Sequence, residues 1–331
     1  MYISFLCGLV TLGMRLYWLM HAGVPPVDTP TVWDAYFPEL RLSGVTAADL
    51  RRSDGHFDVL LLGASVLAPQ FGTIDQQLRE LLGARLGERG RVWNLAVSGQ
   101  TSRDSLIKYR RLSDKHFDLV LIYDAINDVR MNNCRPGEFR EDYSHSRRYE
   151  GFERHLRQGS AEFADMLHQA ELFNDLLAGG SMSNLREFGR DIKTPPAYRR
   201  NIEEIMELAR KRVGRIALLS FASHIPADYT RADFDAHRVD YSYRDDGHSC
   251  AVELWGDPDP VRKTLAAHNQ DLREIAMRHP EALFVDMQAA IPPRGEFFVD
   301  PCHLTEAGCR KFVETLQPVL EEAIQDWERR Q

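Results

Sequence analysis

The sequence lacks the features that mark several large classes of protein. It has no basic block interleaved with aromatic residues, and its 331 residues carry a formal net charge of −8, which argues against a nucleic-acid-binding surface. It contains no internal repeat and no low-complexity tract. With 44% hydrophobic and 27% charged residues, the composition fits one large α/β domain with appendages, whose core needs no metal or disulfide.

Cysteine is scarce, and its spacing excludes the common metal-binding motifs. Of the five cysteines, Cys7 lies in an apolar N-terminal segment, and none falls in a CxxC or zinc-ligand pattern. The others, Cys134, Cys250, Cys302 and Cys309, allow several disulfide pairings, and the sequence neither chooses among them nor excludes free thiols. The cysteine spacing thus gives no sign of a metal site, and the disulfide state stays open; no cofactor is predicted.

Charge is almost absent from residues 1–24, where Arg15 is the only formally charged side chain. The segment is long enough to span a bilayer and ends at Pro25-Pro26, but it lacks the basic start and the cleavage site of a signal peptide. It is either a membrane anchor, with the catalytic domain outside the cytoplasm, or an apolar helix docked on a soluble protein. Residues 25–54 contain proline and are weakly patterned, which predicts a linker or a surface arm.

From residue 55 onward, short apolar runs alternate with amphipathic helical patterns. Five runs without polar alternation predict buried parallel strands, at 59–62, 92–96, 119–123, 216–219 and 283–286. The alternation predicts an α/β fold over residues 55–331, a three-layer α/β/α sandwich around a five-stranded parallel sheet. Two polar insertions, at about 130–196 and 223–260, interrupt the pattern.

The first predicted strand ends in a turn that carries a serine. In the stretch FDVLLLGAS the apolar run stops at glycine and alanine, and Ser65 follows them. A strand, a tight turn of small residues and a helix lift a side chain off the carboxyl edge of a sheet. We therefore interpret Ser65 as a nucleophile.

A serine nucleophile needs a base that takes its proton and an acidic group that orients the base. Asp300 and His303 lie three residues apart after the fifth strand, just before a helix for which Thr305 is a suitable N-cap. The stretch 245–248 has the same spacing, but no apolar strand precedes it and no apolar helix follows it. Asp300 and His303 are thus the predicted orienting acid and base.

Donors for the oxyanion are also predicted at strand ends. Gly99 lies in the turn after the second strand, where the absence of Cβ lets its N–H approach a substrate. Asn127 follows the third strand and can donate from its side-chain amide, and the N–H of Ser65 would be a third donor. Lys108, Arg130 and Arg135, near the edge of the same strand, could bind an anionic substrate, although each of these side chains is more often solvated.

Four short blocks resemble the SGNH/GDSL hydrolase family. They are Gly63-Ala64-Ser65, Gly99 in NLAVSGQT, Ala125-Ile126-Asn127-Asp128 and Asp300-Pro301-Cys302-His303, in the family's order and each at a predicted strand end. The resemblance covers about residues 57–320 without the two insertions. It implies a flavodoxin-like three-layer fold, no metal and hydrolysis of carboxylic esters, with Ser65 as nucleophile, His303 as base, Asp300 as its orienter, and Gly99 and Asn127 as oxyanion donors.

The sequence departs from the family pattern at two positions. Ala64 stands where the family has aspartate, and because that aspartate is not the triad acid we expect a change in loop geometry rather than in chemistry. Ala125 stands where the family usually has glycine. If the backbone there requires a positive φ, the Cβ of Ala125 would strain it and could misplace Asn127.

The predicted function is a serine hydrolase that cleaves carboxylic esters, an O-acyl or acetyl esterase acting on a saccharide or a lipid. An O-acyltransferase that passes the same acyl group to a sugar hydroxyl is one alternative. A catalytically silent carbohydrate-binding module, with its pocket disabled at Ala64 and Ala125, is the other. Predicted partners are small-molecule, glycan or lipid esters, with membrane contact through residues 1–24 if they form an anchor.

Overall fold

The computed structural model describes residues 2–52, 54–159, 183–210, 212–244 and 249–331. The chain divides into two compact units. The first comprises Met1–Ala48 with Tyr143–Gly180, and the second comprises Asp49–Asp142 with Ser181–Gln331.

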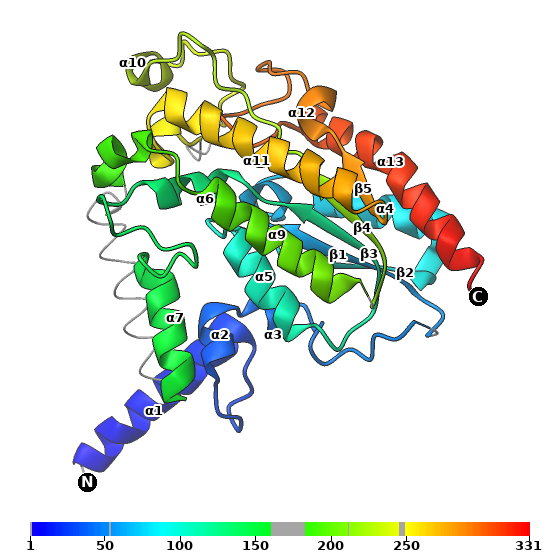
Figure 1. Cartoon of the computed structure of the whole chain (residues 1–331). Coiled ribbons are helices and arrows are strands. Elements are labelled where there is room, and N and C mark those ends of the chain that lie inside the picture. Colours follow the sequence, from blue (N-terminus) through cyan, green and yellow to red (C-terminus); the bar gives the residue numbers. More distant parts are fainter. Residues whose placement is uncertain (1, 53, 160–182, 211, 245–248) are drawn as a thin grey trace. The chain divides into compact units, whose positions relative to one another are not determined.

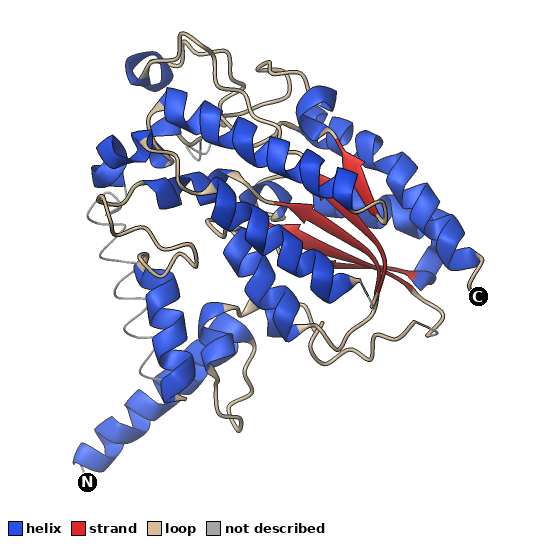
Figure 2. Cartoon of the chain, viewed as in Figure 1, coloured by secondary structure: helices blue, strands red, loops and turns tan. Residues whose placement is uncertain are grey.

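Five parallel strands form the sheet of the second unit, in the order β2-β1-β3-β4-β5 (Figures 1 and 2). They are β1 (Phe57–Gly63), β2 (Gly90–Asn94), β3 (Phe117–Tyr123), β4 (Val213–Leu219) and β5 (Ala282–Val285). This confirms the predicted α/β fold with a five-stranded parallel sheet. From β1 the chain passes to β2 on one side of it and then crosses back to β3 on the other side. The carboxyl ends of β1 and β3 are therefore the topological switch point of the sheet.

The central strands are apolar because both faces of the sheet are covered. Every residue of β1 and β3 is buried, and each strand has one charged residue, Asp58 and Asp118 respectively. Their register pairs Leu61 with Leu121, so apolar side chains of the two strands stack side by side. Because all the strands are parallel, the residues that follow them gather at one edge.

Helices cover both faces of the sheet (Figures 1 and 2). One layer consists of α5 (Ser102–Arg111), α9 (Pro195–Ala209) and α11 (Pro258–Arg278), and the other of α4 (Ile74–Leu86) and α13 (Glu306–Glu328). Thr305 is the N-cap of α13, as predicted, and its Oγ accepts a 3.1 Å hydrogen bond from the Gly308 N–H.

Short helices and 3₁₀ turns complete the second unit. They are η1 (Ser65–Leu67), η2 (Gly87–Arg89), α6 (Ile126–Val129), η3 (Arg130–Asn132), η4 (Ser183–Arg190), α10 (Arg231–Asp235), η5 (Val252–Leu254) and α12 (Met287–Ala290). Both predicted insertions therefore contain local structure.

The first unit is helical. Among its described residues, the helices are α1 (Tyr2–Ala22), α2 (Val32–Tyr36), α3 (Glu39–Leu42) and α7 (Arg147–Gln158). Phe152 of α7 packs edge-on against the rings of Tyr36 and Phe37, with centroids 5.3 and 5.2 Å apart. The Tyr36 hydroxyl also lies 2.8 Å from Nδ1 of His155. Part of residues 25–54 thus packs against a helix of the first insertion.

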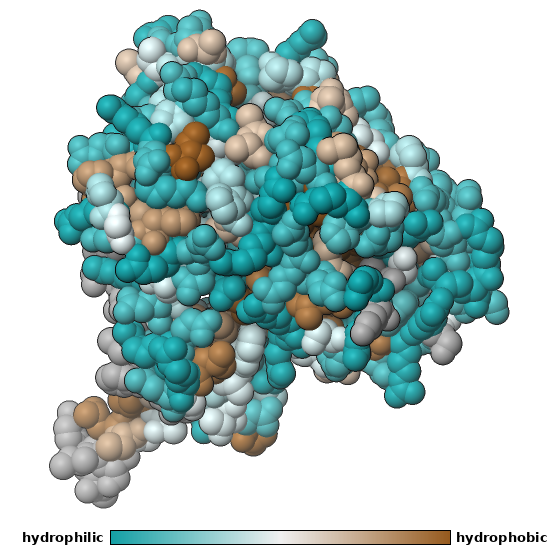
Figure 3. All heavy atoms as spheres, viewed as in Figure 1, coloured by the Kyte–Doolittle hydropathy of each residue, from teal (hydrophilic) through white to brown (hydrophobic). Residues whose placement is uncertain are grey.

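Helix α1 exposes many of its apolar side chains, and Figure 3 colours such residues brown. The exposed residues include Leu6, Leu9, Val10, Leu12, Leu16, Leu19 and Met20. The guanidinium of Arg15 donates to the carbonyl of Asp28. Within the described part of the chain, no helix has both the length and the apolar character needed to cross a bilayer, which does not support the predicted anchor.

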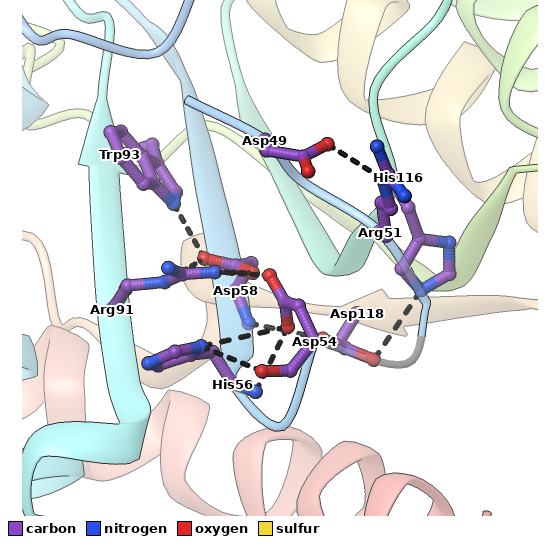
Figure 4. A network of polar contacts seen from close by, with 9 residues as sticks. All are labelled: Asp49, Arg51, Asp54, His56, Asp58, Arg91, Trp93, His116 and Asp118. Carbon is purple, nitrogen blue, oxygen red and sulfur yellow. Dashed lines mark hydrogen bonds and ion pairs between the residues drawn. The ribbon is translucent and has the colours of Figure 1, made fainter. Parts of the chain in front are cut away.

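A network of charged residues joins the starts of β1, β2 and β3 (Figure 4). Arg91 of β2 makes a two-pronged contact with the buried carboxylate of Asp58, at 2.7 Å to Oδ1 and 2.6 Å to Oδ2. The indole of Trp93 donates to the same Oδ1 at 2.7 Å, and the Asp58 N–H donates to Asp118 at 3.1 Å. The network therefore compensates the buried charges at the amino edge of the sheet.

This network leads to a stability prediction. We expect Arg91→Ala to lower the free energy of unfolding by about 3 kcal/mol, because it leaves the Asp58 carboxylate buried without its counter-charge. Urea denaturation followed by circular dichroism measures the change. The matched control is Arg51→Ala, which removes an exposed ion pair with Asp49 and should change stability very little. Equal losses in the two variants would contradict this account.

Candidate active site

Ser65 begins η1, at the point where β1 turns into a 3₁₀ helix. A Cβ on Gly63 would lie 2.7 Å from the Tyr123 carbonyl oxygen and 2.9 Å from Leu67 Cδ1, so only glycine lets the ends of β1 and β3 approach this closely. Ala64 has φ −120°, which any L residue adopts, so alanine there introduces no backbone strain. The turn presents Ser65 at the carboxyl edge with 4% of its surface exposed.

Asp300 and His303 lie in a short loop closed by backbone hydrogen bonds. Phe298 and Leu304 form an antiparallel bridge, and the N–H of Val299 donates to the His303 carbonyl at 2.9 Å. Because this bridge closes just before α13, the loop is held at both ends. It carries the carboxylate and the imidazole to the edge where Ser65 lies.

The structure brings Ser65, His303 and Asp300 into one hydrogen-bonded chain. The Ser65 Oγ lies 2.8 Å from His303 Nε2, and His303 Nδ1 lies 2.7 Å from Asp300 Oδ2. Because a carboxylate only accepts, its bond favours the imidazole tautomer with the proton on Nδ1. Nε2 then has a lone pair, to which the Ser65 hydroxyl can donate.

The Asp300 carboxylate is fully buried and well supplied with donors. Its Oδ1 accepts from the N–H groups of Cys302 and His303, at 2.9 and 2.8 Å. Its Oδ2 accepts from the Cys250 N–H at 2.9 Å in addition to the imidazole. These bonds orient the carboxylate and offset the cost of burying its charge.

The predicted oxyanion donors follow the strands on either side of β1. Gly99 follows β2 and has φ +79°, a conformation that favours glycine. The turn leads into α5, whose N-cap Thr101 and N3 residue Asp104 form a capping box. The turn that carries the Gly99 N–H is thus supported by the start of α5.

Asn127 follows β3 and is held by two hydrogen bonds. Its Nδ2 donates to the Gln100 carbonyl at 2.9 Å, and its Oδ1 accepts from the Trp255 indole N–H at 3.0 Å. Ala125, two residues before it, has φ 175°, which is extended backbone open to any residue. Alanine at this position therefore does not strain the backbone. The two hydrogen bonds fix the orientation of the Asn127 side chain.

Lys108 is buried and bonded to residues next to these turns, so its side chain is not exposed for substrate binding. It is completely buried, and its ammonium donates to Gln100 Oε1 at 2.5 Å and to the Leu95 carbonyl. The view of Lys108 as either a substrate-binding or a solvated residue is therefore wrong. Its charge instead ties the end of β2 to the turn that contains Gly99.

Asp128 connects the loop after β3 with the start of α5. Its Oδ2 accepts from the Ser102 N–H at 2.9 Å and its Oδ1 from the Ser102 hydroxyl at 2.5 Å. The Asn201 amide of α9 donates to the same hydroxyl at 2.9 Å. These hydrogen bonds give Asp128 a structural role next to Asn127, joining the loop after β3 to α5 and α9.

Asp124, the first residue after β3, is buried beside other acidic groups. Burial raises the pKa of its carboxyl to about 7, and the nearby charge of Asp128 acts in the same direction. The Ser105 hydroxyl donates to its Oδ2 at 2.6 Å and favours the charged form. Asp124 is therefore a carboxyl behind the site whose charged form is disfavoured by burial.

Several side chains around the site carried no signal in the sequence. The ring of Phe71 stacks on the His303 imidazole, with centroids 4.8 Å apart and planes inclined by 15°. Trp255 and Cys250 lie in the second insertion, which has no apolar periodicity. Gln100 was predictable only as the neighbour of Gly99. The stretch 245–248, which repeats the spacing of Asp300 and His303, lies outside the described residues.

One group of side chains has donors close enough to be considered as a metal site. Within the described residues, the donor atoms of Cys250, Asp300 and His303 lie within 4.8 Å of one another. Burial raises the pKa of the Cys250 thiol to about 12, and a protonated thiol is a poor metal ligand. Asp300 and His303 are already hydrogen-bonded to each other, so the donor set fits a metal poorly. All five cysteines are free thiols.

No protein-family model and no curated protein matches the chain. Among solved structures, the chain is similar to a GDSL-like lipase from Bacteroides thetaiotaomicron, with 15% identity and a TM-score of 0.47, over 87% of this chain and 98% of the other. It is also similar to Axe2, an acetylxylan esterase from Geobacillus stearothermophilus, with 17% identity and a TM-score of 0.46, over 81% of this chain and 95% of the other.

Asp124 leads to a pH-dependent prediction. Its folded pKa of about 7 lies above the value near 4 of an unfolded chain, so its protonated form stabilises the fold below pH 4 and this contribution is lost as the pH rises to 7. Relative to Asp124→Asn, we expect the unfolding free energy of the wild type to fall by up to about 1.4 kcal/mol per pH unit in this range. Urea denaturation of both proteins from pH 4 to 8 measures this change. An unfolding free energy of the wild type that rises with pH relative to that of Asp124→Asn would contradict the prediction.

Proposed function

We propose that the protein is a serine hydrolase that cleaves carboxylic esters, with Ser65 as nucleophile, His303 as general base and Asp300 as its orienting group. The observation that supports it best is the chain of hydrogen bonds from the Ser65 hydroxyl through the imidazole to a buried carboxylate, at 2.8 and 2.7 Å. Such a chain is the arrangement that activates a serine for attack on an acyl group.

In the proposed acylation step, His303 Nε2 takes the hydroxyl proton while Ser65 Oγ forms a bond to the ester carbonyl carbon. The imidazolium that forms is stabilised by Asp300, which keeps its own charge. His303 then gives the proton to the leaving alcohol oxygen as the ester bond breaks. The products are a free alcohol and an acyl group on Ser65.

The oxyanion of the tetrahedral intermediate is proposed to accept hydrogen bonds from the N–H groups of Ser65 and Gly99 and from the amide of Asn127. Water then attacks the acyl group and gives its proton to His303 Nε2, and Ser65 leaves as it recovers that proton. The reaction consumes one ester and one water and releases an acid and an alcohol, with no metal or cofactor.

The substrate class rests on the resemblance of the four blocks to SGNH/GDSL hydrolases. We propose an O-acyl or acetyl ester of a saccharide or a lipid. Transfer of the acyl group to a sugar hydroxyl would use the same first step, so a supplied sugar acceptor that outcompetes water would indicate a transferase.

Ser65→Ala tests the proposal. We expect the purified protein to hydrolyse short p-nitrophenyl esters and this variant to lose at least about 10³-fold in kcat, because the nucleophile is gone while the fold is kept. A spectrophotometric assay over a series of acyl chain lengths measures activity and chain preference together. Ser113→Ala, a partly exposed serine after α5, is the matched control and should keep wild-type activity.

A fluorophosphonate probe provides an independent test. The wild type should carry one covalent label on Ser65, and Ser65→Ala should carry none. An unlabelled wild-type protein that hydrolyses no ester would contradict the proposal and favour the carbohydrate-binding module. Unchanged turnover in Ser65→Ala would reject Ser65 as the nucleophile.

A further inference from the structure

The second insertion, at about 223–260, contributes two contacts to the candidate active site. The Cys250 N–H donates to Asp300, and the Trp255 indole donates to Asn127. Trp255 is 2% exposed and follows η5, where its own N–H donates to the Val252 carbonyl at 2.9 Å. A segment that looks like a polar excursion in the sequence therefore reaches both the acid and the predicted oxyanion amide.

The two neighbours of Asn127 determine which way its amide faces. An indole N–H can only donate, so the atom that it meets is the amide oxygen. The Gln100 carbonyl can only accept, so the atom that it meets is the amide nitrogen. One N–H of Nδ2 is used in this way, and the second remains to donate to a substrate oxygen.

We propose that Trp255 is a positioning residue, whose indole N–H holds the Asn127 amide in the orientation that stabilises the oxyanion. The inference rests on the proposed hydrolase function and assigns the second insertion a part in it. Without the indole donor, Asn127 Oδ1 is left as a buried acceptor without a partner, and the amide gains freedom to rotate away. Preorganised donors lose their catalytic effect when they must reorient during the reaction.

The test is Trp255→Phe, which keeps a buried aromatic ring and removes the N–H. We expect kcat for a short p-nitrophenyl ester to fall about 10- to 100-fold, less than the 10²–10³ of a lost oxyanion donor, with KM nearly unchanged. A loss confined to KM, or wild-type kinetics in a folded variant, would overturn the proposal.

Trp327→Phe is the matched control, because Trp327 is also fully buried and its indole nitrogen has no hydrogen-bond partner among the described residues. It packs on Phe57 at the start of β1, with centroids 6.0 Å apart. This variant should lose stability without losing kcat. An equal decrease in kcat in both variants would show a general packing effect and reject the specific role of Trp255.

A double-mutant cycle separates positioning from any other role. If Trp255 acts through Asn127, then Trp255→Phe should have little further effect on kcat when Asn127 is already alanine. Full additivity of the two losses would overturn the proposal. Tyr229→Phe offers a second route if Trp255→Phe does not fold, because the Tyr229 hydroxyl accepts from the Val252 N–H at 3.2 Å and supports η5.

Tyr229→Phe removes two hydrogen bonds to η5, the one from the Val252 N–H and the one that the hydroxyl donates to Glu253 at 3.0 Å. It should lower kcat about 2- to 10-fold and again leave KM nearly unchanged. Failure of this inference can be told from failure of the proposed function. An active wild type with an inactive Ser65→Ala variant and a fully active Trp255→Phe variant rejects only the role of Trp255. A wild type that neither hydrolyses esters nor reacts with a fluorophosphonate rejects both.

Discussion

The parallel direction of all five strands is the constraint on which the site depends. It brings the residues that follow β1, β2 and β3 to one edge, where the β2-β1-β3 order makes the ends of these strands neighbours. Ser65 and His303 are 238 positions apart in the chain, yet their side chains lie 2.8 Å apart at this edge. An antiparallel pairing of β1 with either neighbour would separate these turns.

The two edges of the sheet carry charge in different ways. At the amino edge Asp58 is paired with Arg91, so the buried carboxylate is compensated within the sheet (Figure 4). At the carboxyl edge, Asp300 has no arginine or lysine partner in the described part of the chain. Its carboxylate instead accepts hydrogen bonds from backbone N–H groups and from an imidazole. A guanidinium in place of that imidazole would leave no group able to exchange a proton with Ser65.

The sheet was predictable because a strand covered on both faces must be an unbroken apolar run, and β1 and β3 are such runs. Ser65, Asp300 and His303 could be proposed because each directly follows an apolar run or precedes a capped helix. Trp255 could not, since its position comes from a long segment without periodicity and its partner is 128 residues away. Nor could the burial of Lys108, because a lysine on an amphipathic helix is usually solvated.

The two alanines that depart from the family pattern bear on whether the site is intact. Ala64 and Ala125 both have backbone angles open to any L residue, so neither Cβ forces the turn to change. Where glycine is needed, at Gly63 and Gly99, the chain has kept it. Strain in the backbone therefore gives no reason to regard the candidate site as disabled, and hydrogen bonds hold Asp300 and Asn127 in defined orientations.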